Sequence, residues 1–191
     1  MASREEKQID IIKAAIRVFS EHGFDGAKME YIAKEAGIGK GTVYEYFESK
    51  DRLFEEILKF SIEEFRVGLK ECMEQGETIE ERLQNCSRYY AGFYSSHMDI
   101  VQVFMQVSTL SKEIRGQLIA EHMAILKHYT EMVQAAKLNG EIREDLDEEL
   151  ATYCIVGSLD LFSKQRVFIE PRPLGEIDYQ AIVDVVLRGL K

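Results

Sequence analysis

The sequence predicts an all-α protein, and three observations lead to this fold class. The only two prolines, Pro171 and Pro173, lie late in the chain, so long stretches before them can stay helical without interruption. Hydrophobic residues make up 46% and charged residues 30% of the 191 positions, the balance of a soluble globular protein. Apolar residues recur at steps of three and four, which is the period of an amphipathic helix, and no segment reads convincingly as a strand. We therefore expect about nine helices.

The first three helices are short or sharply bounded. The first begins at a capping box formed by Ser3 and Glu6 and stops at Gly23, because glycine accepts the left-handed conformation that ends a helix. A short helix follows and ends at Gly37, and an even shorter one spans about residues 40–46. Together they predict a three-helix unit at the front of the chain.

The remaining helices are longer and carry broad apolar faces. Ser49 caps a helix that continues almost to Gly76, and Asp145 with Glu148 forms a second capping box. The segment around Gly175 is a turn because it follows two closely spaced prolines. The later helices are expected at about 78–96, 98–107, 111–139, 146–168 and 178–190. We therefore divide the chain into a front domain, residues 1–50, and a helical domain, residues 51–191.

Net charge and the distribution of apolar residues restrict the classes of function that the chain can have. The formal net charge is −10, but residues 1–50 contribute only −1 of it, with eight Lys/Arg against nine Asp/Glu. The acidity thus lies mainly outside the front domain, and composition alone leaves nucleic-acid binding open. No apolar run is long enough for a membrane span, and the first residues lack the apolar core of a signal peptide. We expect a cytoplasmic protein without membrane association.

No pattern indicates a metal site, a cofactor or a catalytic centre. Cys72, Cys86 and Cys154 are odd in number and far apart, so they predict neither a disulfide framework nor a zinc site. His97, His122 and His128 do not have the spacing of a zinc-binding motif. No Ser-His-Asp, Cys-His or glycine-rich phosphate-loop arrangement is present either. We therefore expect no enzyme activity, no metal and no cofactor.

Residues 23–54 carry the clearest functional pattern. Two short helices joined through residues 36–39 fit a helix-turn-helix, since the glycines permit a sharp turn between crossing helices. In the second helix Val43 and Phe47 are four apart and can anchor it to a core, which leaves its other side chains outward. The outward residues are Lys40, Thr42, Tyr44, Glu45 and Tyr46. Most of them suit phosphates and base edges in a major groove.

This stretch resembles the DNA-binding domain of TetR-type repressors, the tetracycline-repressor family. The matching positions are Ala15, Phe19, Gly23-Phe24, Ile32-Ala33, Ala36-Gly37, Lys40-Gly41-Thr42-Val43-Tyr44, Phe47, Ser49-Lys50 and Leu53-Phe54. The match covers roughly the first quarter of the chain, with a weaker similarity at residues 140–147. The resemblance implies a homodimer, a ligand pocket in the C-terminal helical domain, and release of operator DNA when ligand binds.

The resemblance also implies which residues touch DNA. Lys40, Thr42, Tyr44 and Tyr46 fall where the family contacts DNA, and Lys50 falls where it grips a phosphate. The family usually has a hydroxyl-bearing residue at the start of the second helix, whereas this chain has Ala27-Lys28, so the Lys28 ammonium would replace that phosphate contact. Glu45 also departs from the pattern, and its carboxylate would either read a cytosine amino group or point away from the DNA.

The predicted effector site is apolar and aromatic. Rings and thioethers gather on three consecutive segments between residues 78 and 139, a lining typical of pockets for drug-sized ligands. The candidates are Tyr89, Tyr90, Phe93, Tyr94, Phe104, Met105, His122, Met123 and Met132. Ordinary core packing is the alternative for each. The effector is expected to be a small hydrophobic or aromatic molecule, and an acidic domain with tyrosine faces would also favour a cation.

The last two helices are expected to form the dimer interface. A terminal helix that is apolar around much of its circumference needs more cover than one small domain gives. The candidate interface residues are Leu150, Cys154, Ile155, Ser158, Leu161, Phe162, Ile182, Val183 and Val186. The alternative is that both helices close the core of a monomer.

Taken together, these features predict a ligand-responsive repressor. As a dimer it would bind a pseudo-palindromic, double-stranded operator, and the effector would release it. A different class remains open: a ligand-binding or protein-interaction dimer whose DNA-binding head is no longer used.

Overall fold

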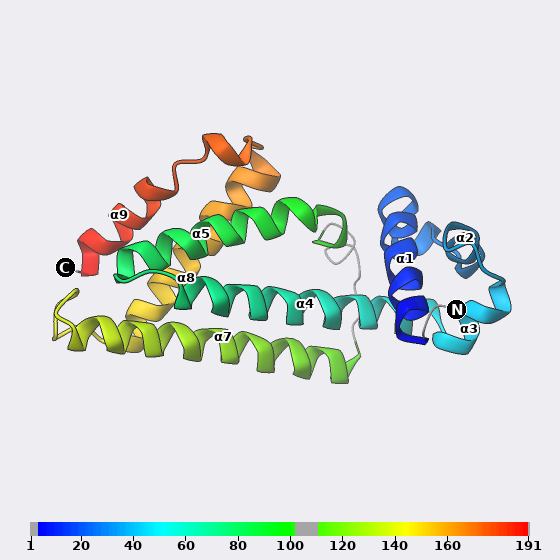
Figure 1. Ribbon diagram of the computed structural model, residues 1–191, viewed down its shortest axis with the longest axis horizontal. Helices are drawn as coiled ribbons and strands as arrows, with labels where there is room; N and C mark the ends of the chain where they lie inside the picture. The colour runs from blue at the N-terminus through cyan, green and yellow to red at the C-terminus, as the bar shows by residue number, and fades with distance from the viewer. Residues whose placement is uncertain (1–3, 102–110, 191) are drawn as a thin grey trace. The chain divides into compact units, whose positions relative to one another are not determined.

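The computed structural model describes residues 4–101 and 111–190, and it confirms the all-α class. Within these residues there are eight α-helices with both ends described, a further helical stretch at residues 98–101, and no strand (Figure 1). The rest of the helix expected at about 98–107 lies outside the described residues. The helices are α1 (Arg4–Gly26), α2 (Met29–Glu35), α3 (Lys40–Tyr46), α4 (Lys50–Glu74), α5 (Ile79–Ser96), α7 (Lys112–Leu138), α8 (Glu148–Lys164) and α9 (Tyr179–Leu190). A π-helical turn (Gln165–Ile169) follows α8, and a short 3-10 helix (Leu174–Glu176) precedes α9.

Several helix boundaries follow the predicted local signals. The Ser49 side chain accepts a hydrogen bond from the Arg52 amide at 3.1 Å, which caps the start of α4. Gly37 and Gly140 have φ values of 67° and 72°, the left-handed conformation expected after α2 and α7. The predicted end of α1 at Gly23 becomes a break with φ 68°, after which helical structure continues to Gly26.

The predicted start of α8 is wrong by two residues. Asp147, not Asp145, is the N-cap, and its side chain accepts a hydrogen bond from the Leu150 amide at 2.9 Å. Both aspartates have a suitable side chain, but Asp145 lies in a turn, whereas Asp147 directly precedes the helix and has the extended backbone (φ −70°, ψ 119°) typical of an N-cap. The segment predicted as helix to residue 168 includes the π-helical turn.

The chain forms two compact units. Unit 1 comprises Met1–Ile62 with His97–Gln117, and unit 2 comprises Glu63–Ser96 with Leu118–Lys191. The units meet at three points along the chain: inside α4, at the end of α5 and inside α7. None of the helices in the described residues is long and apolar enough to cross a membrane.

Unit 1 has a core built from α1, α2, α3 and the first turns of α4. Ile11, Phe19, Ile32, Val43 and Leu53 are each at most 2% exposed. A group of three rings completes it: Phe19, Phe24 and Phe54 have centroids 5.1 to 5.8 Å apart. Since aromatic pairs at this spacing add to the burial of apolar surface, the three rings fix α1 on α4.

Unit 2 has a separate core to which five helices contribute. Its buried side chains come from the second half of α4, from α5, α7 and α8, and from α9. Leu83, Tyr129, Ile155 and Val183 are completely buried, one on each of α5, α7, α8 and α9. The four helices are therefore packed around one apolar core.

Candidate DNA-binding and effector sites

Helix α3 is anchored by its apolar side and presents its polar side to solvent. Val43 is completely buried and Phe47 is 3% exposed, as their four-residue spacing predicted. The preceding turn uses Gly37 in the left-handed region, and Gly39 accepts the first hydrogen bond of α3 from the Thr42 amide. The two anchors therefore determine which residues of α3 face outward.

The predicted DNA contacts of α3 lie on its accessible side. Lys40 is exposed and Tyr44 is 45% exposed, a high value for a large aromatic side chain. Thr42 and Tyr46 are partly exposed. An exposed tyrosine and an ammonium group suit both phosphate oxygens and base edges, and their exposure leaves them available for the DNA contacts that the sequence predicts.

Glu45 and Tyr46 border a depression that also involves the start of α1. Arg4, Lys7, Glu45 and Tyr46 line it, and its volume is about 510 Å³. The Arg4 guanidinium lies 5.7 Å from the centroid of the Tyr46 ring, a cation–π distance. Two cationic side chains therefore accompany the Glu45 carboxylate at this end of α3.

Lys28 occupies the N-cap position of α2 and makes no side-chain cap, as the missing hydroxyl predicted. Its ammonium is exposed and lies 5.6 Å from the Tyr31 ring centroid, and the Tyr31 ring lies 5.3 Å from the His22 ring. The Lys28 ammonium thus stays accessible to solvent at the start of the helix-turn-helix.

Lys50 lies differently from the other basic candidates. Its side chain is directed toward the end of α1, where the Nζ atom donates hydrogen bonds to the carbonyl oxygens of Phe24, Asp25 and Ala27. It is only partly exposed.

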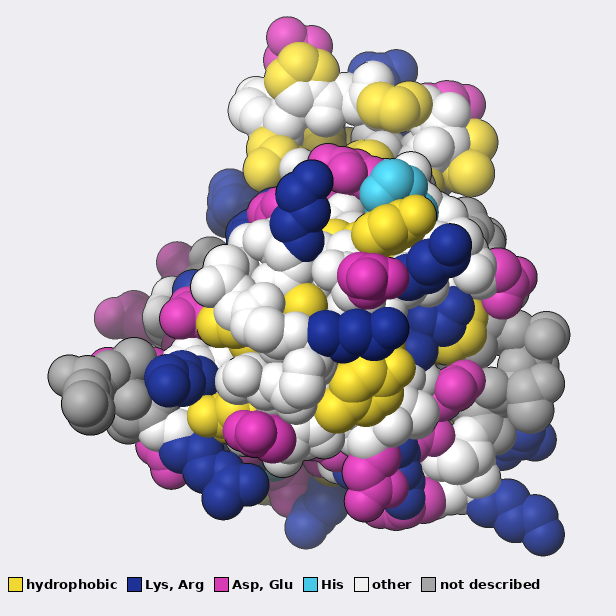
Figure 2. Space-filling model, turned by 90° about the vertical axis from the view of Figure 1, so that its right-hand side faces the viewer, with side chains coloured by type: hydrophobic (Ala, Val, Ile, Leu, Met, Phe, Trp, Pro, Cys, Tyr) yellow, Lys and Arg dark blue, Asp and Glu magenta, His cyan; other side chains and the backbone are white. Residues whose placement is uncertain are grey.

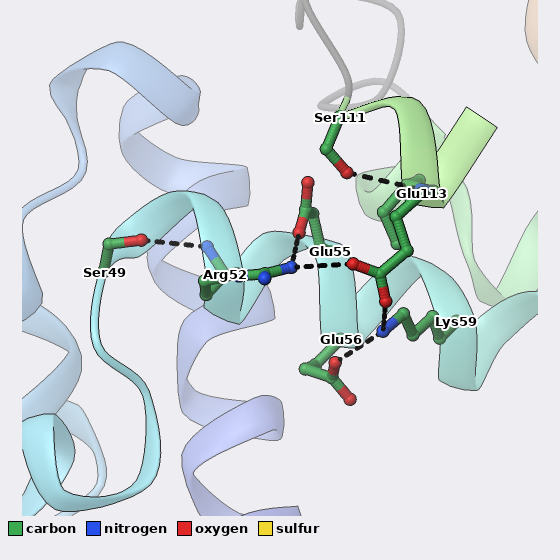
Figure 3. Close-up of polar contacts among 8 residues, drawn as sticks. Ser49, Arg52, Glu55, Glu56, Lys59, Ser111 and Glu113 are labelled. Atoms are coloured by element: carbon green, nitrogen blue, oxygen red, sulfur yellow. Dashed lines mark hydrogen bonds and ion pairs between the residues drawn. The ribbon is translucent and has the colours of Figure 1, made fainter. Parts of the chain in front are cut away.

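The first turns of α4 are joined to the start of α7 by ion pairs (Figure 3). Arg52 Nη1 lies 2.8 Å from Glu55 and 3.5 Å from Glu113, and Lys59 Nζ pairs with Glu56 at 2.9 Å and Glu113 at 3.8 Å. Burial opposes ionisation of Glu55, but hydrogen bonds from Ser111 and Arg52 outweigh it and lower the Glu55 pKa. The group contains three carboxylates and two cations, so it holds α7 on α4 without adding positive charge.

The surface that carries α2 and α3 is mixed in charge. Figure 2 shows Lys and Arg side chains interspersed with Asp and Glu and with small apolar areas. This pattern agrees with the near-neutral balance of residues 1–50. Any attraction to DNA must therefore come from the local placement of a few cations, because the unit as a whole provides no strong positive field.

The aromatic effector candidates on α5 meet one further ring from α4. The Phe65 centroid lies 4.9 to 6.3 Å from the centroids of Tyr89, Tyr90, Phe93 and Tyr94, four of the predicted residues. We call these five rings the aromatic cluster. The sequence showed four rings in six residues, but Phe65 is distant along the chain and carried no local signal.

A polar group adjoins one side of the aromatic cluster. The Tyr94 hydroxyl donates a hydrogen bond to Asp160, which also pairs with the Lys164 ammonium at 2.7 Å. The Phe168 ring lies 5.6 Å from the Tyr94 ring. Burial, with the nearby Asp160 carboxylate, raises the pKa of Tyr94, so this phenol remains a donor at neutral pH. Asp160 therefore has partners on both α5 and α8.

Further polar side chains lie in the core of unit 2 or pack against it. The Tyr129 hydroxyl is fully buried, with Cys86 and Tyr90 as its polar neighbours. Burial raises the pKa of the Cys86 thiol to about 12, so this group is a neutral thiol and not a reactive thiolate. The Tyr89 hydroxyl donates to the Glu64 carbonyl at 3.1 Å, and burial raises the pKa of Tyr89 to about 12.

The structure does not gather all the predicted effector residues. His122 and Met123 lie on the exposed side of α7, and Met123 is 57% exposed. Met132 is buried in the core of unit 2. The helical period misled the assignment because α7 covers the core with only one face. Phe104 and Met105 lie outside the described residues, and among those that are described no cluster of His, Cys, Asp and Glu could hold a metal ion.

The predicted dimer residues divide into two groups. Ile155 and Val183 are completely buried within their own unit and leave no surface for a partner. The α8 residues Leu150, Cys154 and Leu161 are exposed, and Ser158 and Phe162 are partly exposed. Ile182 and Val186 on α9 are partly buried and pack against the core of unit 2. Leu150 and Leu161 are 63% and 68% exposed. These two leucines leave apolar surface exposed on α8.

A helix-turn-helix unit followed by a helical unit with an aromatic core defines a class of ligand-binding transcription regulators. Comparison with known families agrees: residues 11–57 match the bacterial regulatory proteins of the tetR family, and residues 76–163 match the tetracyclin repressor-like C-terminal domain. The chain belongs to the tetR family of DNA-binding transcription regulators.

Its relatives include a fatty acid metabolism regulator protein of Bacillus subtilis, 29% identical over 165 residues, which covers 84% of this chain and 83% of the relative. Among solved structures, FadR from Bacillus subtilis in complex with stearoyl-CoA is 25% identical with a TM-score of 0.72, over 94% of this chain and 95% of the other. The fatty acid degradation regulator FadR from Bacillus halodurans has a TM-score of 0.73 at 24% identity, over 98% and 95%.

Proposed function

We propose that this protein is a repressor that binds a pseudo-palindromic operator as a homodimer and leaves it when a hydrophobic effector enters unit 2. The observation that carries the proposal is the exposed polar side of α3, held by two buried anchors on a tetR-family head. Lys28, Lys40, Thr42, Tyr44 and Tyr46 would contact the DNA. Each half-site would receive one α3 in the major groove.

The effector we propose carries a fatty acyl chain. The aromatic cluster, with the buried apolar residues around it, supplies the surface that such a chain prefers, and Tyr94, Asp160 and Lys164 supply polar partners beside it. A relative at 29% identity is named as a fatty acid metabolism regulator, and a solved structure at 25% identity holds stearoyl-CoA. Both relatives favour an acyl thioester over the aromatic cations that the sequence left open.

The dimer would form through the outer side of α8 and α9. Leu150, Tyr153 and Leu161 on α8 and Val185 on α9 are 47% to 68% exposed. An obligate interface of this kind buries about 2,000 Å² or more in total. Without a dimer, one head would hold one half-site only and the paired-groove model would fail.

Binding to DNA from the chain's own upstream region tests the proposal. Fluorescence anisotropy would be recorded at several salt concentrations, with stearoyl-CoA, free coenzyme A, an aromatic cation or a sugar phosphate added. We expect salt-dependent binding that only the acyl thioester reverses, with a rise in melting temperature of unit 2. Release by the sugar phosphate alone would contradict an apolar effector site.

Sedimentation equilibrium tests the interface. We expect a dimer for the native chain and a 22.0 kDa monomer for Leu161→Glu. Ile119→Glu is the matched control, because Ile119 is 59% exposed on α7 and lies outside the proposed interface. A native monomer, or equal effects of the two substitutions, would contradict a dimer through α8 and α9.

A further inference from the structure

Lys50 is the first residue of α4, yet its side chain leaves that helix and ends among carbonyl groups of another. The Nζ atom lies 2.5 Å from the Phe24 oxygen, 3.1 Å from the Ala27 oxygen and 3.3 Å from the Asp25 oxygen. An ammonium group has three N–H donors and accepts nothing. Three carbonyl oxygens therefore engage all of its donors.

Helix electrostatics explain this direction. The N-terminal end of a helix carries a partial positive charge, which disfavours a cation at the first residue of α4. The carbonyl groups at the end of a helix carry a partial negative charge. Those of Phe24 and Asp25 lie at the end of α1, after its break at Gly23, and Ala27 follows the helix directly. The Lys50 side chain thus moves its charge from an unfavourable helix end to a favourable one.

A ring beneath the ammonium strengthens the same contact. Lys50 Nζ lies 4.5 Å from the centroid of the Phe24 ring, within the range of a cation–π interaction. Phe24 in turn packs on Phe19 and Phe54, whose rings join α1 to α4. The ammonium group therefore contacts both the Phe24 ring of this three-ring group and the backbone that leads into α2.

We infer that Lys50 is a positioning residue that fixes the α1–α2 connection to the start of α4, and that its ammonium is not a phosphate ligand. Helix α2 begins at Met29, two residues after the Ala27 carbonyl that Lys50 binds. Lys50 would therefore set where the helix-turn-helix begins relative to α4. The inference rests on the proposed DNA binding only for its effect on operator affinity; the structural contact itself does not require DNA.

Four variants separate the two roles: Lys50→Met, Lys50→Arg, Lys40→Met and Lys40→Arg. The Lys40 pair is the matched control, since Lys40 is exposed and expected to meet a phosphate. Arginine keeps or improves a phosphate contact, but its planar guanidinium cannot direct donors to three converging carbonyls as an ammonium does. We expect both Lys50 variants to lower the melting temperature, speed amide exchange at residues 24–32, and weaken operator binding by about tenfold.

The salt dependence of binding gives the deciding readout. The slope of log K against log salt should stay at the native value in both Lys50 variants and become shallower by about 0.9 in Lys40→Met. A constant fraction of unfolded head lowers affinity without altering this slope, so partial unfolding does not hide the result. A shallower slope in Lys50→Met, or full affinity in Lys50→Arg, would overturn the inference.

The measurements of melting temperature and amide exchange do not depend on DNA binding. If the native chain bound no upstream DNA, the proposed function would fail while the contact remained testable by melting and amide exchange. Native melting temperature and native exchange at residues 24–32 in Lys50→Met would show that the three hydrogen bonds hold nothing in place, and would overturn the inference by themselves.

Discussion

The helix-turn-helix of unit 1 and the core of unit 2 place their functional candidates in opposite environments. In unit 1 the candidates Lys28, Lys40 and Tyr44 are exposed, while Val43 and Phe47 carry the packing. In unit 2 candidates such as Tyr90 are themselves part of the core. The proposed binding residues and the packing residues are therefore separate in the head, whereas they coincide in the proposed effector region.

This comparison predicts how substitutions behave. Substituting an exposed side chain of α3 should change stability little, because such a side chain makes few packing contacts in the folded protein. Removing a ring of the aromatic cluster should destabilise the protein, because it leaves a cavity. The following predictions test this difference, from the largest expected effect to the smallest.

Phe65→Ala should have the largest effect on stability. Phe65 contacts four rings of α5, so its loss opens a cavity and should lower the free energy of unfolding by roughly 2–3 kcal/mol. Val67→Ala, at a position of α4 that is 43% exposed, is the control. Thermal unfolding measures both, and equal losses would mean that the aromatic cluster is not a structural centre.

Gly68→Ala should disturb the aromatic cluster from the other side. A methyl group at Gly68 would overlap the Tyr89 ring, displace it and break its hydrogen bond to the Glu64 carbonyl. We expect destabilisation of about 1–3 kcal/mol. Gly92→Ala on α5 meets no atom within 4 Å and should instead stabilise the helix by about 0.5–1 kcal/mol. Chemical denaturation measures the free energy of unfolding of both variants. A shift in the same direction for both would contradict the close packing of Gly68 against the Tyr89 ring.

Tyr44→Ala should weaken operator binding by about tenfold, or roughly 1.4 kcal/mol, while leaving the melting temperature near the native value. The reason is that Tyr44 is nearly half exposed and that Val43 and Phe47 already hold α3. Anisotropy and thermal unfolding on the same sample check the two halves of this prediction. A large drop in melting temperature would place Tyr44 with the packing residues instead.

Glu55→Gln should have a small effect that depends on pH. The Glu55 pKa is lowered below its ordinary value of 4.5, so the ion pair stabilises the fold above that value and is lost as pH falls through the lowered pKa. The melting temperature of the native chain should therefore fall more steeply than that of Glu55→Gln between about pH 5 and pH 3. Parallel curves for the two proteins would show that ionisation of Glu55 contributes nothing to stability.

Local patterns in the sequence predicted the head better than the effector region. The spacing of Val43 and Phe47, the glycine at position 37 and the cap at Ser49 act within one helical turn, and the structure has them as expected. The direction of the Lys50 side chain depends on a backbone more than twenty residues away, and no local pattern encodes it.

The effector region depends on contacts between distant helices, and this is why its prediction was incomplete. Phe65 joins Tyr90 and Phe93 only because α4 packs on α5. Periodicity could not tell which face of α7 meets the core, so exposed Met123 was grouped with the buried residues. Asp160 lies in an apolar run of α8, and its partner Tyr94 is 66 residues away in the sequence.

The measurement that tests the division of roles most directly is the operator dissociation constant with and without saturating stearoyl-CoA. It would be made on the native chain, on Tyr44→Phe in the head and on Phe93→Leu in the aromatic cluster. The ratio of the two constants gives the coupling between effector and DNA. Tyr44→Phe should raise both constants by the same factor and keep the native ratio, whereas Phe93→Leu should leave the effector-free constant unchanged and alter the ratio. The division of roles would be contradicted if Tyr44→Phe altered the ratio. It would also be contradicted if Phe93→Leu changed the effector-free dissociation constant and kept the native ratio.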